Sequence, residues 1–312
     1  MTNTLITGGS GLLGSALTIK NSFKPNSNEL NLLNYSMLSD YIESNKISSI
    51  IHCAARVGGV HANTKWIYEF FDDNLVMNLN ILRACRDHKI DNSIFILSTC
   101  ILPADGPFPL TEEFLHLGEP HFTNYGYAYA KRMLEVGARC LKDEYGIRST
   151  CIIPCNFYGS NDNYDLVGGH VIPSIIHKCY LAMQNNTDLE VWGSGLPERE
   201  FIFVKDLSRV IETVHFDQML NTKEYPQTMI VSSGESCSIR EIVNLIISEM
   251  GFNGNITFDK TKPDGILRKP TSNALFEKNF SDFCWTDMKE GIKESVNYFK
   301  QNYPNIRKGS NK

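Results

Sequence analysis

A glycine-rich segment near the N-terminus constrains the fold of this chain more than any other feature. The segment reads Thr7-Gly-Gly-Ser-Gly-Leu-Leu-Gly14, follows the apolar stretch Leu5-Ile6 and opens a helical pattern that continues to about Ile19. Glycines at these positions allow a tight turn and let backbone N–H groups approach a diphosphate. The pattern predicts a dinucleotide-binding strand, turn and helix, and the alternative is a turn that is merely rich in glycine.

The rest of the first half alternates apolar strand patterns with helical patterns. The expected strands are residues 48–54, 94–98 and 150–154, and the expected helices are residues 64–85 and 127–145. Such alternation is typical of a parallel sheet covered by helices. We therefore predict a doubly wound, Rossmann-like α/β domain over residues 1–155.

The second half has a different texture, with a loop-like stretch at residues 158–165. We expect helices at residues 171–183, from 206 and from 238, and strands at residues 189–191, 200–203 and 228–232. Ser238 and Glu241 have the spacing of a capping box at the start of the last of these helices. These elements predict a smaller C-terminal α/β substrate-binding domain over most of residues 156–312, from which a strand or two can return to the main sheet.

The composition excludes several classes of protein. A chain of 312 residues with 42% hydrophobic residues suits two domains, and a net charge of -5 offers no attraction to nucleic acid. No apolar run approaches the roughly 20 residues that span a bilayer, and the first residues lack the features of a signal peptide. Nine cysteines without a Cys-x-x-Cys pattern are expected to be reduced thiols, not disulfide partners or zinc ligands. We therefore expect a cytoplasmic protein that binds no metal, membrane or nucleic acid.

Three polar residues form a candidate reaction centre. Ser98 ends an apolar strand pattern, at the carboxyl end where parallel α/β sheets bind their ligands. Tyr127 and Lys131 are four residues apart and share one face of the expected helix. A hydroxyl, a phenol and an ammonium beside a nicotinamide can exchange a proton with a carbinol oxygen, and the cation is expected to favour the phenolate. The alternative is a surface tyrosine that packs over a lysine stem.

The glycine segment, Ser98 and Tyr127-x-x-x-Lys131 together resemble the extended short-chain dehydrogenase/reductase family. Further stretches in the same order along the chain are similar to the GDP-L-fucose synthases, a family of GDP-4-keto-6-deoxymannose epimerase/reductases within it. These stretches are His52-Cys-Ala-Ala-Arg-Val-Gly-Gly59, Ser98-Thr-Cys100, Pro154-Cys-Asn-Phe-Tyr-Gly159, Gly169-His-Val-Ile-Pro173, Val191-Trp-Gly-Ser-Gly-Leu-Pro-Glu-Arg-Glu-Phe-Ile202 and Lys262-Pro-Asp-Gly265. The resemblance covers nearly the whole chain.

The resemblance implies that one site performs two reactions. Carbons 3 and 5 of GDP-4-keto-6-deoxy-D-mannose are epimerised first, with Cys100 and His170 as the matching acid/base pair. NADPH then reduces the 4-keto group to give GDP-L-fucose, while Tyr127 supplies the proton and Lys131 and Ser98 assist. The chemistry is coherent, because donors to the ketone oxygen also stabilise the enolate that forms when a neighbouring proton leaves. Without the resemblance, Cys100 is interpreted as a core cysteine and His170 as a loop histidine.

The predicted cofactor is NADP(H). NAD-specific folds place an acidic residue about 20 residues after the glycines, but residues 23–28 include Lys24 and no carboxylate. A misplaced second strand is the alternative. By the resemblance, bacterial relatives carry arginine where this chain has Ser10 and again near Ser27, which leaves Lys24 as the candidate partner of the 2′-phosphate. The cofactor-binding residues that the resemblance implies are Gly8, Gly9, Ser10, Gly11, Leu12, Leu13, Gly14, Lys131, Pro154, Asn156, Phe157 and His170.

A GDP-sugar also needs cations for its diphosphate and a flat surface for its base. The substrate-binding residues that the resemblance implies are Lys178, Trp192, Arg199, Asp264 and Lys269. Arg199 and Lys178 would face phosphate, with Trp192 against the nucleotide. The alternatives are a solvated helix face for Lys178 and a core position for Trp192. A homodimer is expected by the same resemblance.

Two other functions are compatible with parts of the pattern. Another nucleotide-sugar epimerase, reductase or dehydratase would share the fold, although a simple 4-epimerase needs no pair such as Cys100 and His170. A non-catalytic NADP-binding regulatory protein would be expected to lose part of the set Ser98, Tyr127 and Lys131, and this chain keeps all three.

Overall fold

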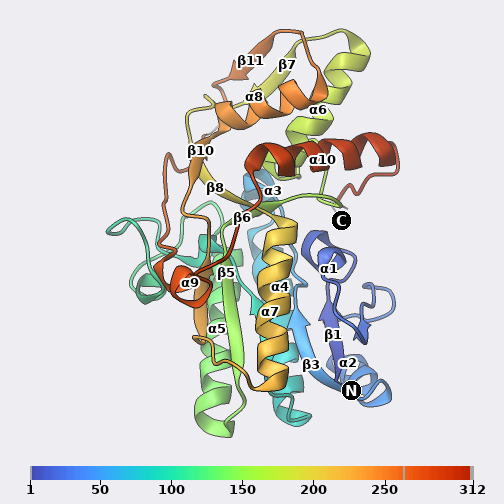
Figure 1. The fold of residues 1–312 in the computed structure, drawn as a ribbon, viewed down its shortest axis with the longest axis vertical. Coiled ribbons are helices and arrows are strands. Elements are labelled where there is room, and N and C mark those ends of the chain that lie inside the picture. The colour runs from blue at the N-terminus through green and yellow to red at the C-terminus, as the bar shows by residue number, and fades with distance from the viewer. Residues whose placement is uncertain (1, 263, 310–312) are drawn as a thin grey trace.

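The computed structural model of the protein describes residues 2–262 and 264–309 and contains a six-stranded parallel sheet (Figure 1). The strand order is β2 (Ser22–Phe23), β1 (Asn3–Thr7), β3 (Ile47–His52), β4 (Ser93–Ile96), β5 (Ser149–Pro154) and β9 (Thr228–Val231). Every neighbouring pair is parallel. The predicted Rossmann-like α/β fold is confirmed. Pro263 of the Lys262–Gly265 motif and the last three residues of the predicted second domain lie outside the described residues.

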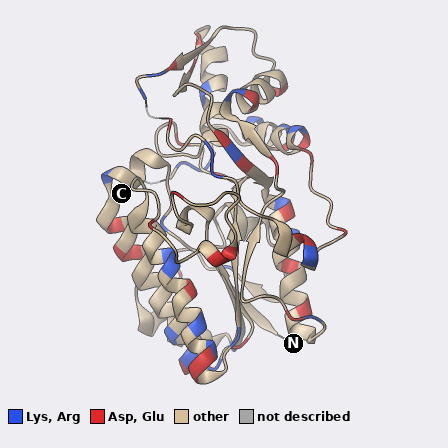
Figure 2. Ribbon diagram, turned by 90° about the vertical axis from the view of Figure 1, so that its left-hand side faces the viewer, with Lys and Arg blue, Asp and Glu red and all other residues tan. Residues whose placement is uncertain are grey.

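The strands of this sheet are buried on both faces because helices cover both. On one face, Leu5, Ile50 and Phe95 pack in a core with α2 (Tyr35–Ser44), α4 (Ile67–Asp87) and α5 (Tyr125–Tyr145). Their chain neighbours, such as Ile6 and Ile51, face a second core that includes α1 (Leu12–Ala16) and α7 (Val204–Leu220). Figure 2 shows charged residues along the outer faces of the helices, whereas the central strands carry none. This burial explains why the strands read as continuous apolar runs.

Most of the remaining elements lie beyond the carboxyl ends of the main strands, in the upper part of Figure 1, whereas α9 (Ala274–Asn279) packs against β9. Three strands form one small sheet in the order β10 (Ser236–Ser238), β8 (Glu198–Phe203) and β6 (Asn156–Tyr158), and β7 (Leu189–Trp192) pairs in parallel with β11 (Ile256–Asp259). Helices α6 (Val171–Asn185), α8 (Ile239–Met250) and α10 (Met288–Asn302) pack against one another. The chain returns to the main sheet at β9, so the sheet draws on both halves of the sequence. The division into two domains at residue 155 stays a prediction.

Most expected elements are found, with local differences. The first helix ends at Ala16 and not at Ile19, and Ser238 and Glu241 form the predicted capping box. The stretch expected to be a loop at residues 158–165 contains no helix or strand after Tyr158, the last residue of the short strand β6. Strands of two or three residues, such as β2 and β6, show no periodicity in the sequence, because a period of two needs more residues to become visible.

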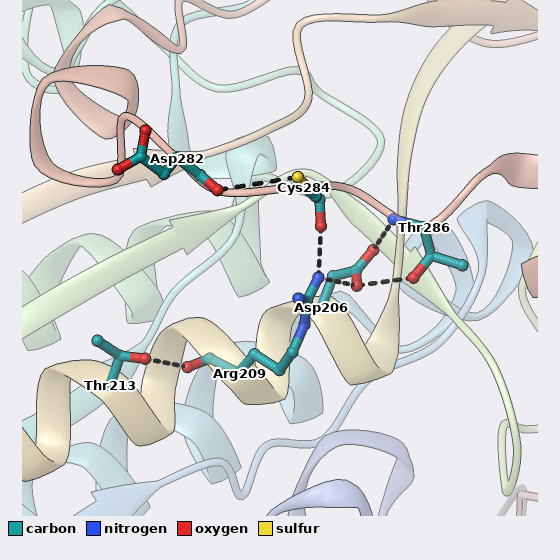
Figure 3. Close-up of polar contacts among 6 residues, drawn as sticks. All are labelled: Asp206, Arg209, Thr213, Asp282, Cys284 and Thr286. Carbon is teal, nitrogen blue, oxygen red and sulfur yellow. Dashed lines mark hydrogen bonds and ion pairs between the residues drawn. The ribbon is translucent and has the colours of Figure 1, made fainter.

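A buried carboxylate fixes the N-terminal turn of α7 to the segment that precedes α10 (Figure 3). Asp206 is 1% exposed and accepts hydrogen bonds from the Thr286 backbone N–H and hydroxyl, each at 2.8 Å. Arg209 donates to Asp206 at 2.7 Å and to the Cys284 carbonyl at 2.5 Å, and it lies over the Phe283 ring. The ion pair therefore has the further hydrogen bonds that a buried charge requires. It joins a helix of the main fold to the last third of the chain.

No helix in residues 2–262 and 264–309 combines the length and apolarity that would let it cross a membrane. All nine cysteines are free thiols.

Candidate active site

Ser98 and Cys100 lie on a short turn at the carboxyl end of β4. Ser98 caps the 3₁₀ turn Thr99–Ile101, and its Oγ accepts a hydrogen bond from the Cys100 N–H at 3.3 Å. Both side chains are half-buried. The strand end thus presents a hydroxyl and a thiol two residues apart, where ligands bind in such sheets.

Tyr127 and Lys131 lie on the first turns of α5, as predicted. The helix approaches α4 closely at Gly126, where a Cβ would stand 2.6 Å from the Ile67 carbonyl oxygen. Lys131 is 1% exposed, and its Nζ donates to the Ile96 carbonyl at 2.9 Å. Since Ile96 ends β4, this bond ties the face of α5 that carries Lys131 to the strand that presents Ser98.

The electrostatics of this pair differ from the expectation in one respect. Burial, and then the charge of a Cys100 thiolate, raise the pKa of Tyr127 well above its ordinary value. Burial lowers the pKa of Lys131 to about 8, and the thiols Cys53 and Cys100 oppose that shift. The expected bias of Tyr127 toward phenolate is therefore wrong for this structure, because burial and the Cys100 charge both favour the neutral phenol. The phenol is held in the protonated form, which suits a proton donor.

Two further cations surround the Cys100 turn. Lys269 donates from Nζ to the carbonyls of Leu102 at 2.8 Å and Thr99 at 3.3 Å. Arg132, 4% exposed, donates from Nε to the Ile101 carbonyl at 2.6 Å. The carbonyls on the C-terminal side of the turn are therefore bound by fixed positive charges. The sequence grouped Lys269 with the substrate-binding residues, and the structure places its ammonium beside the Cys100 turn.

The Cys100 thiol responds to this environment. Burial raises its pKa, while the hydrogen bond with Ser98 and the charges of Lys269 and Lys131 lower it. Burial lowers the pKa of Lys269 itself to about 8, and the Cys100 charge opposes that shift. The cations thus moderate the effect of burial on the thiol.

His170 lies apart from these residues, at the N-cap of α6. Its Nδ1 is 3.5 Å from Oδ1 of Asp162, and its side chain is 46% exposed. Burial by the surrounding atoms disfavours the charged imidazole, but the hydrogen bond and charge of Asp162 outweigh it and raise the pKa of His170. Among the described residues no hydrogen bond or ion pair joins His170 to Ser98, Cys100 or Tyr127.

His52 lies inside the fold and links three elements beneath the site. It is fully buried, and its Nδ1 and Nε2 lie 2.8 Å from Thr7 Oγ1 and 3.1 Å from Asn78 Oδ1. Asn78 Nδ2 in turn donates to the Ala130 carbonyl at 2.9 Å, one residue before Lys131. Burial and the charge of Lys131 lower the pKa of His52 to about 3, so the ring is neutral.

The glycine segment forms the predicted tight turn. Gly8 has φ of +67° and its carbonyl accepts the Gly11 N–H at 2.9 Å, while a Cβ on Gly14 would stand 2.3 Å from the Gly8 oxygen. A side chain at Gly14 would therefore fill the turn, and the loop backbone is left open to a dinucleotide. Asn161 donates to the Ser10 carbonyl at 2.9 Å, which brings the loop after β6 against the glycine segment.

Lys24 follows β2, where the cofactor ribose is expected. Its Nζ donates to the Leu17 carbonyl at 2.5 Å, and its Cβ lies against Gly9. The ammonium is thus already hydrogen-bonded to the backbone, so the structure does not present Lys24 as a free partner for a 2′-phosphate. Pro154 ends β5, and Asn156 and Phe157 lie in β6 at the carboxyl edge of the main sheet.

The predicted nucleotide end is assembled from α6, β7 and β8. Lys178 Nζ lies 4.2 Å from the centre of the Trp192 ring, which is 38% exposed. Arg199 on β8 is near Asp264, whose Oδ1 accepts the Ser194 N–H at 2.6 Å. The exposed indole with a lysine over it offers a flat surface and a cation, and Arg199 adds a second cation near Asp264.

Three residues around the site were not identified from the sequence. Arg132 and Asp162 are buried charges, and Asn78 is a buried amide, each with a role that is visible only in three dimensions. Because Arg132 directly follows Lys131 in the sequence, that position could have identified it as a candidate site residue. Asp162 carried no usable signal, because carboxylates are common in loops.

Comparison with known proteins gives a consistent assignment. The model of the NAD dependent epimerase/dehydratase family matches residues 4–224. The chain is 41% identical to the GDP-L-fucose synthase of Dictyostelium discoideum over 97% of each chain, and 33% identical to the GDP-L-colitose synthase of Yersinia pseudotuberculosis over 95% of this chain and 97% of that one. The crystal structure of a GDP-L-fucose synthetase from Naegleria fowleri bound to NADP is 36% identical, with a TM-score of 0.89 over 98% of this chain and 95% of that chain. The chain therefore belongs to the NAD dependent epimerase/dehydratase family, and it is a homologue of the GDP-L-fucose synthases.

Proposed function

We propose that this protein is an NADP-dependent enzyme that converts GDP-4-keto-6-deoxy-D-mannose to GDP-L-fucose, by epimerisation at carbons 3 and 5 and reduction at carbon 4. The observation that carries the proposal is the Ser98–Cys100 turn. It places a hydroxyl and a thiol together and is tied to the helix of Tyr127 and Lys131 through the Ile96 carbonyl. A site that needed only reduction would have no use for the thiol.

In the reduction, bound NADPH supplies a hydride to carbon 4. Ser98 Oγ donates a hydrogen bond to the ketone oxygen, and Tyr127 transfers its phenolic proton to the same oxygen as the hydride arrives. Lys131 then favours the phenolate that remains, since an adjacent ammonium stabilises that charge. The raised pKa of Tyr127 supports the role of donor, because the phenol starts protonated.

In the epimerisations, Cys100 and His170 exchange protons at carbons next to the ketone. One removes the proton as a C–H bond breaks, and the other returns a proton to the opposite face. The negative charge moves to the ketone oxygen, where Ser98 and Tyr127 stabilise the enolate by hydrogen bonds. The same electrophilic site therefore supports both reactions.

The remaining assignments follow from this proposal. Lys178 and Arg199 bind the diphosphate and Trp192 contacts the nucleotide, as their placement supports. The glycine segment holds the cofactor diphosphate. A homodimer and a cytoplasmic location remain part of the proposal, and nine free thiols support the latter. The division into a cofactor domain at residues 1–155 and a substrate domain at residues 156–312 is likewise part of the proposal.

The test is an incubation of the protein with NADPH and GDP-4-keto-6-deoxy-D-mannose, followed by product analysis by NMR. We expect NADPH to be consumed and GDP-L-fucose to form. No oxidation of NADPH, or a GDP-deoxysugar with unchanged configuration at carbons 3 and 5, would contradict the proposal. A parallel incubation with NADH measures the cofactor preference.

A further inference from the structure

The segment between β6 and α6 is held on three sides. Asn161 donates to the Ser10 carbonyl of the glycine segment at 2.9 Å, and the Tyr164 N–H donates to the Arg307 carbonyl at 2.9 Å. The Gly59 N–H donates to the Gly168 carbonyl at 3.2 Å. The segment is therefore fixed against the cofactor loop, the C-terminal stretch and the loop after β3, although it has no regular secondary structure of its own.

Asp162 is the buried charge in this segment that the proposed chemistry leaves unused. Its side chain is 2% exposed, and Oδ1 accepts the Asn163 N–H at 2.7 Å while lying 3.5 Å from His170 Nδ1. Oδ2 is buried without a hydrogen-bond partner. A buried carboxylate with one oxygen unpaired costs free energy, and such groups are concentrated where they serve function.

The position of Asp162 determines what His170 can do. A carboxylate 3.5 Å from Nδ1 favours the proton on that nitrogen, so Nε2 is the atom that remains to face a substrate. Among the described residues no hydrogen bond to His170 Nε2 is found, and the imidazole is 46% exposed. The carboxylate also favours the protonated ring, whereas the nearby Arg307 disfavours it. These two residues are the charged groups that act on His170, one from its own loop and one from the C-terminal stretch.

We propose that Asp162 is a positioning residue for His170, which holds Nδ1–H and keeps Nε2–H available as the proton donor in epimerisation. In that step the Nε2–H bond breaks, a C–H bond forms at the sugar carbon, and the neutral imidazole regains its proton from solvent. This inference rests on the proposed function. It adds a residue that acts through another and does not itself contact the sugar.

The first test is the titration of His170, which requires no activity. In full-length protein with ¹³C-labelled histidine, the NMR titration of His170 should move to lower pH in Asp162→Asn, because the substitution removes the charge and preserves the shape. An unchanged titration in this variant would overturn the proposal. Should Asp162→Asn fail to fold, wild-type protein still tests the pairing. Above its pKa the neutral His170 ring should carry its proton on Nδ1, as read from the ring ¹³C shifts, and the Nε2–H tautomer would overturn the proposal.

A matched control comes from the same segment. Asp165 also carries a charge, and its Oδ1 accepts the N–H groups of Val167 and Gly168, which an asparagine can still do. Asp165 acts on His177 and not on His170. Asp165→Asn should therefore move the titration of His177 and leave that of His170 in place. A similar movement of His170 in both variants would show a general effect of the loop and overturn the specific pairing.

The second test separates the two half-reactions. Asp162→Asn should slow exchange of the substrate α-protons with deuterated solvent by roughly 10- to 100-fold near neutral pH, part of what a general acid contributes. The alkaline limb of its pH profile should move to lower pH, and Asp162→Glu should recover part of the rate. Oxidation of GDP-L-fucose by NADP⁺ needs no epimerisation and should be retained. Equal loss of both activities would assign Asp162 a structural role and overturn the proposal. If wild-type protein turns over no such sugar, the proposed function fails, whereas the histidine titration still decides the pairing.

Discussion

Cys100 and His170 are proposed to exchange protons at the same sugar, yet their surroundings differ in nearly every respect. Cys100 is half-buried on a turn whose carbonyls bind Lys269 and Arg132, next to the buried Lys131. His170 is 46% exposed and paired with a carboxylate. The thiol thus lies among positive charges and the imidazole beside a negative one.

The difference indicates how one site can hold two acid/base groups that have separate roles. Positive charges favour a thiolate and a carboxylate favours an imidazolium, so the two environments support opposite charge states. At Cys100 burial outweighs the cations, so the pKa of the thiol still lies above its ordinary value. The two groups are also supported by different parts of the chain, the sheet and α5 for one and the loop before α6 for the other.

The strongest test of the comparison removes the proton donor of the reduction, whose part in stabilising the enolate Ser98 shares. Tyr127→Phe should lower NADPH oxidation by about 10²- to 10⁴-fold, the range of general acid catalysis, while exchange of α-protons with solvent largely survives. Exchange is followed by NMR and oxidation by absorbance. Full reductase activity in Tyr127→Phe would show that another group donates the proton.

Removal of the thiol should give the reverse pattern. Cys100→Ser should slow α-proton exchange by about 10²-fold or more, because an alcohol is a far weaker base than a thiolate. Hydride transfer should fall less, as measured by oxidation of GDP-L-fucose with NADP⁺. An equal decrease in both reactions would remove Cys100 from the epimerisation.

A subtler change tests whether Lys269 serves the reaction centre. Lys269→Met removes the charge that lowers the pKa of Cys100, so alkylation of Cys100 should require a higher pH and α-proton exchange should fall by about tenfold. Site-specific alkylation is measured by mass spectrometry of the Cys100 peptide. As a matched control, Lys178→Met should raise the KM for the GDP-sugar and leave the alkylation profile unchanged. If Lys269→Met affects KM alone, the residue belongs to the nucleotide end.

The smallest expected effect concerns stability beneath the site. The folded protein keeps His52 neutral to about pH 3, whereas the unfolded chain protonates near its ordinary value of 6.5. Stability from this group is present above pH 6.5 and is lost as the pH falls from 6.5 toward 3, by at most about 1.4 kcal/mol per pH unit. Denaturant unfolding between pH 7 and 4 should show a shallower loss in His52→Gln than in wild type. Equal slopes would show that His52 titrates normally in the fold.

Much of the fold and half of the site could be predicted from the sequence. The turn at Gly8 and the helix face shared by Tyr127 and Lys131 depend on local geometry, which residues close together in the sequence determine. Lys269 and Asp162 could not be placed, because their contacts join segments more than a hundred residues apart, or depend on burial that no local pattern reveals. The predicted direction of the shift in the Tyr127 pKa was wrong for the same reason, since desolvation depends on the packed surroundings.

The return of the chain at β9 has a consequence for how this protein is made. As the polypeptide leaves the ribosome, β5 emerges with its outer edge unpaired, and its partner Thr228–Val231 follows only after all of β6, α6, β7, β8 and α7 have been synthesised. An unpaired parallel edge is prone to pair with other chains. A fragment that ends at residue 155 would keep that exposed edge permanently. Truncated forms should therefore aggregate, and the nascent chain must be synthesised through Val231 before its main sheet can be completed.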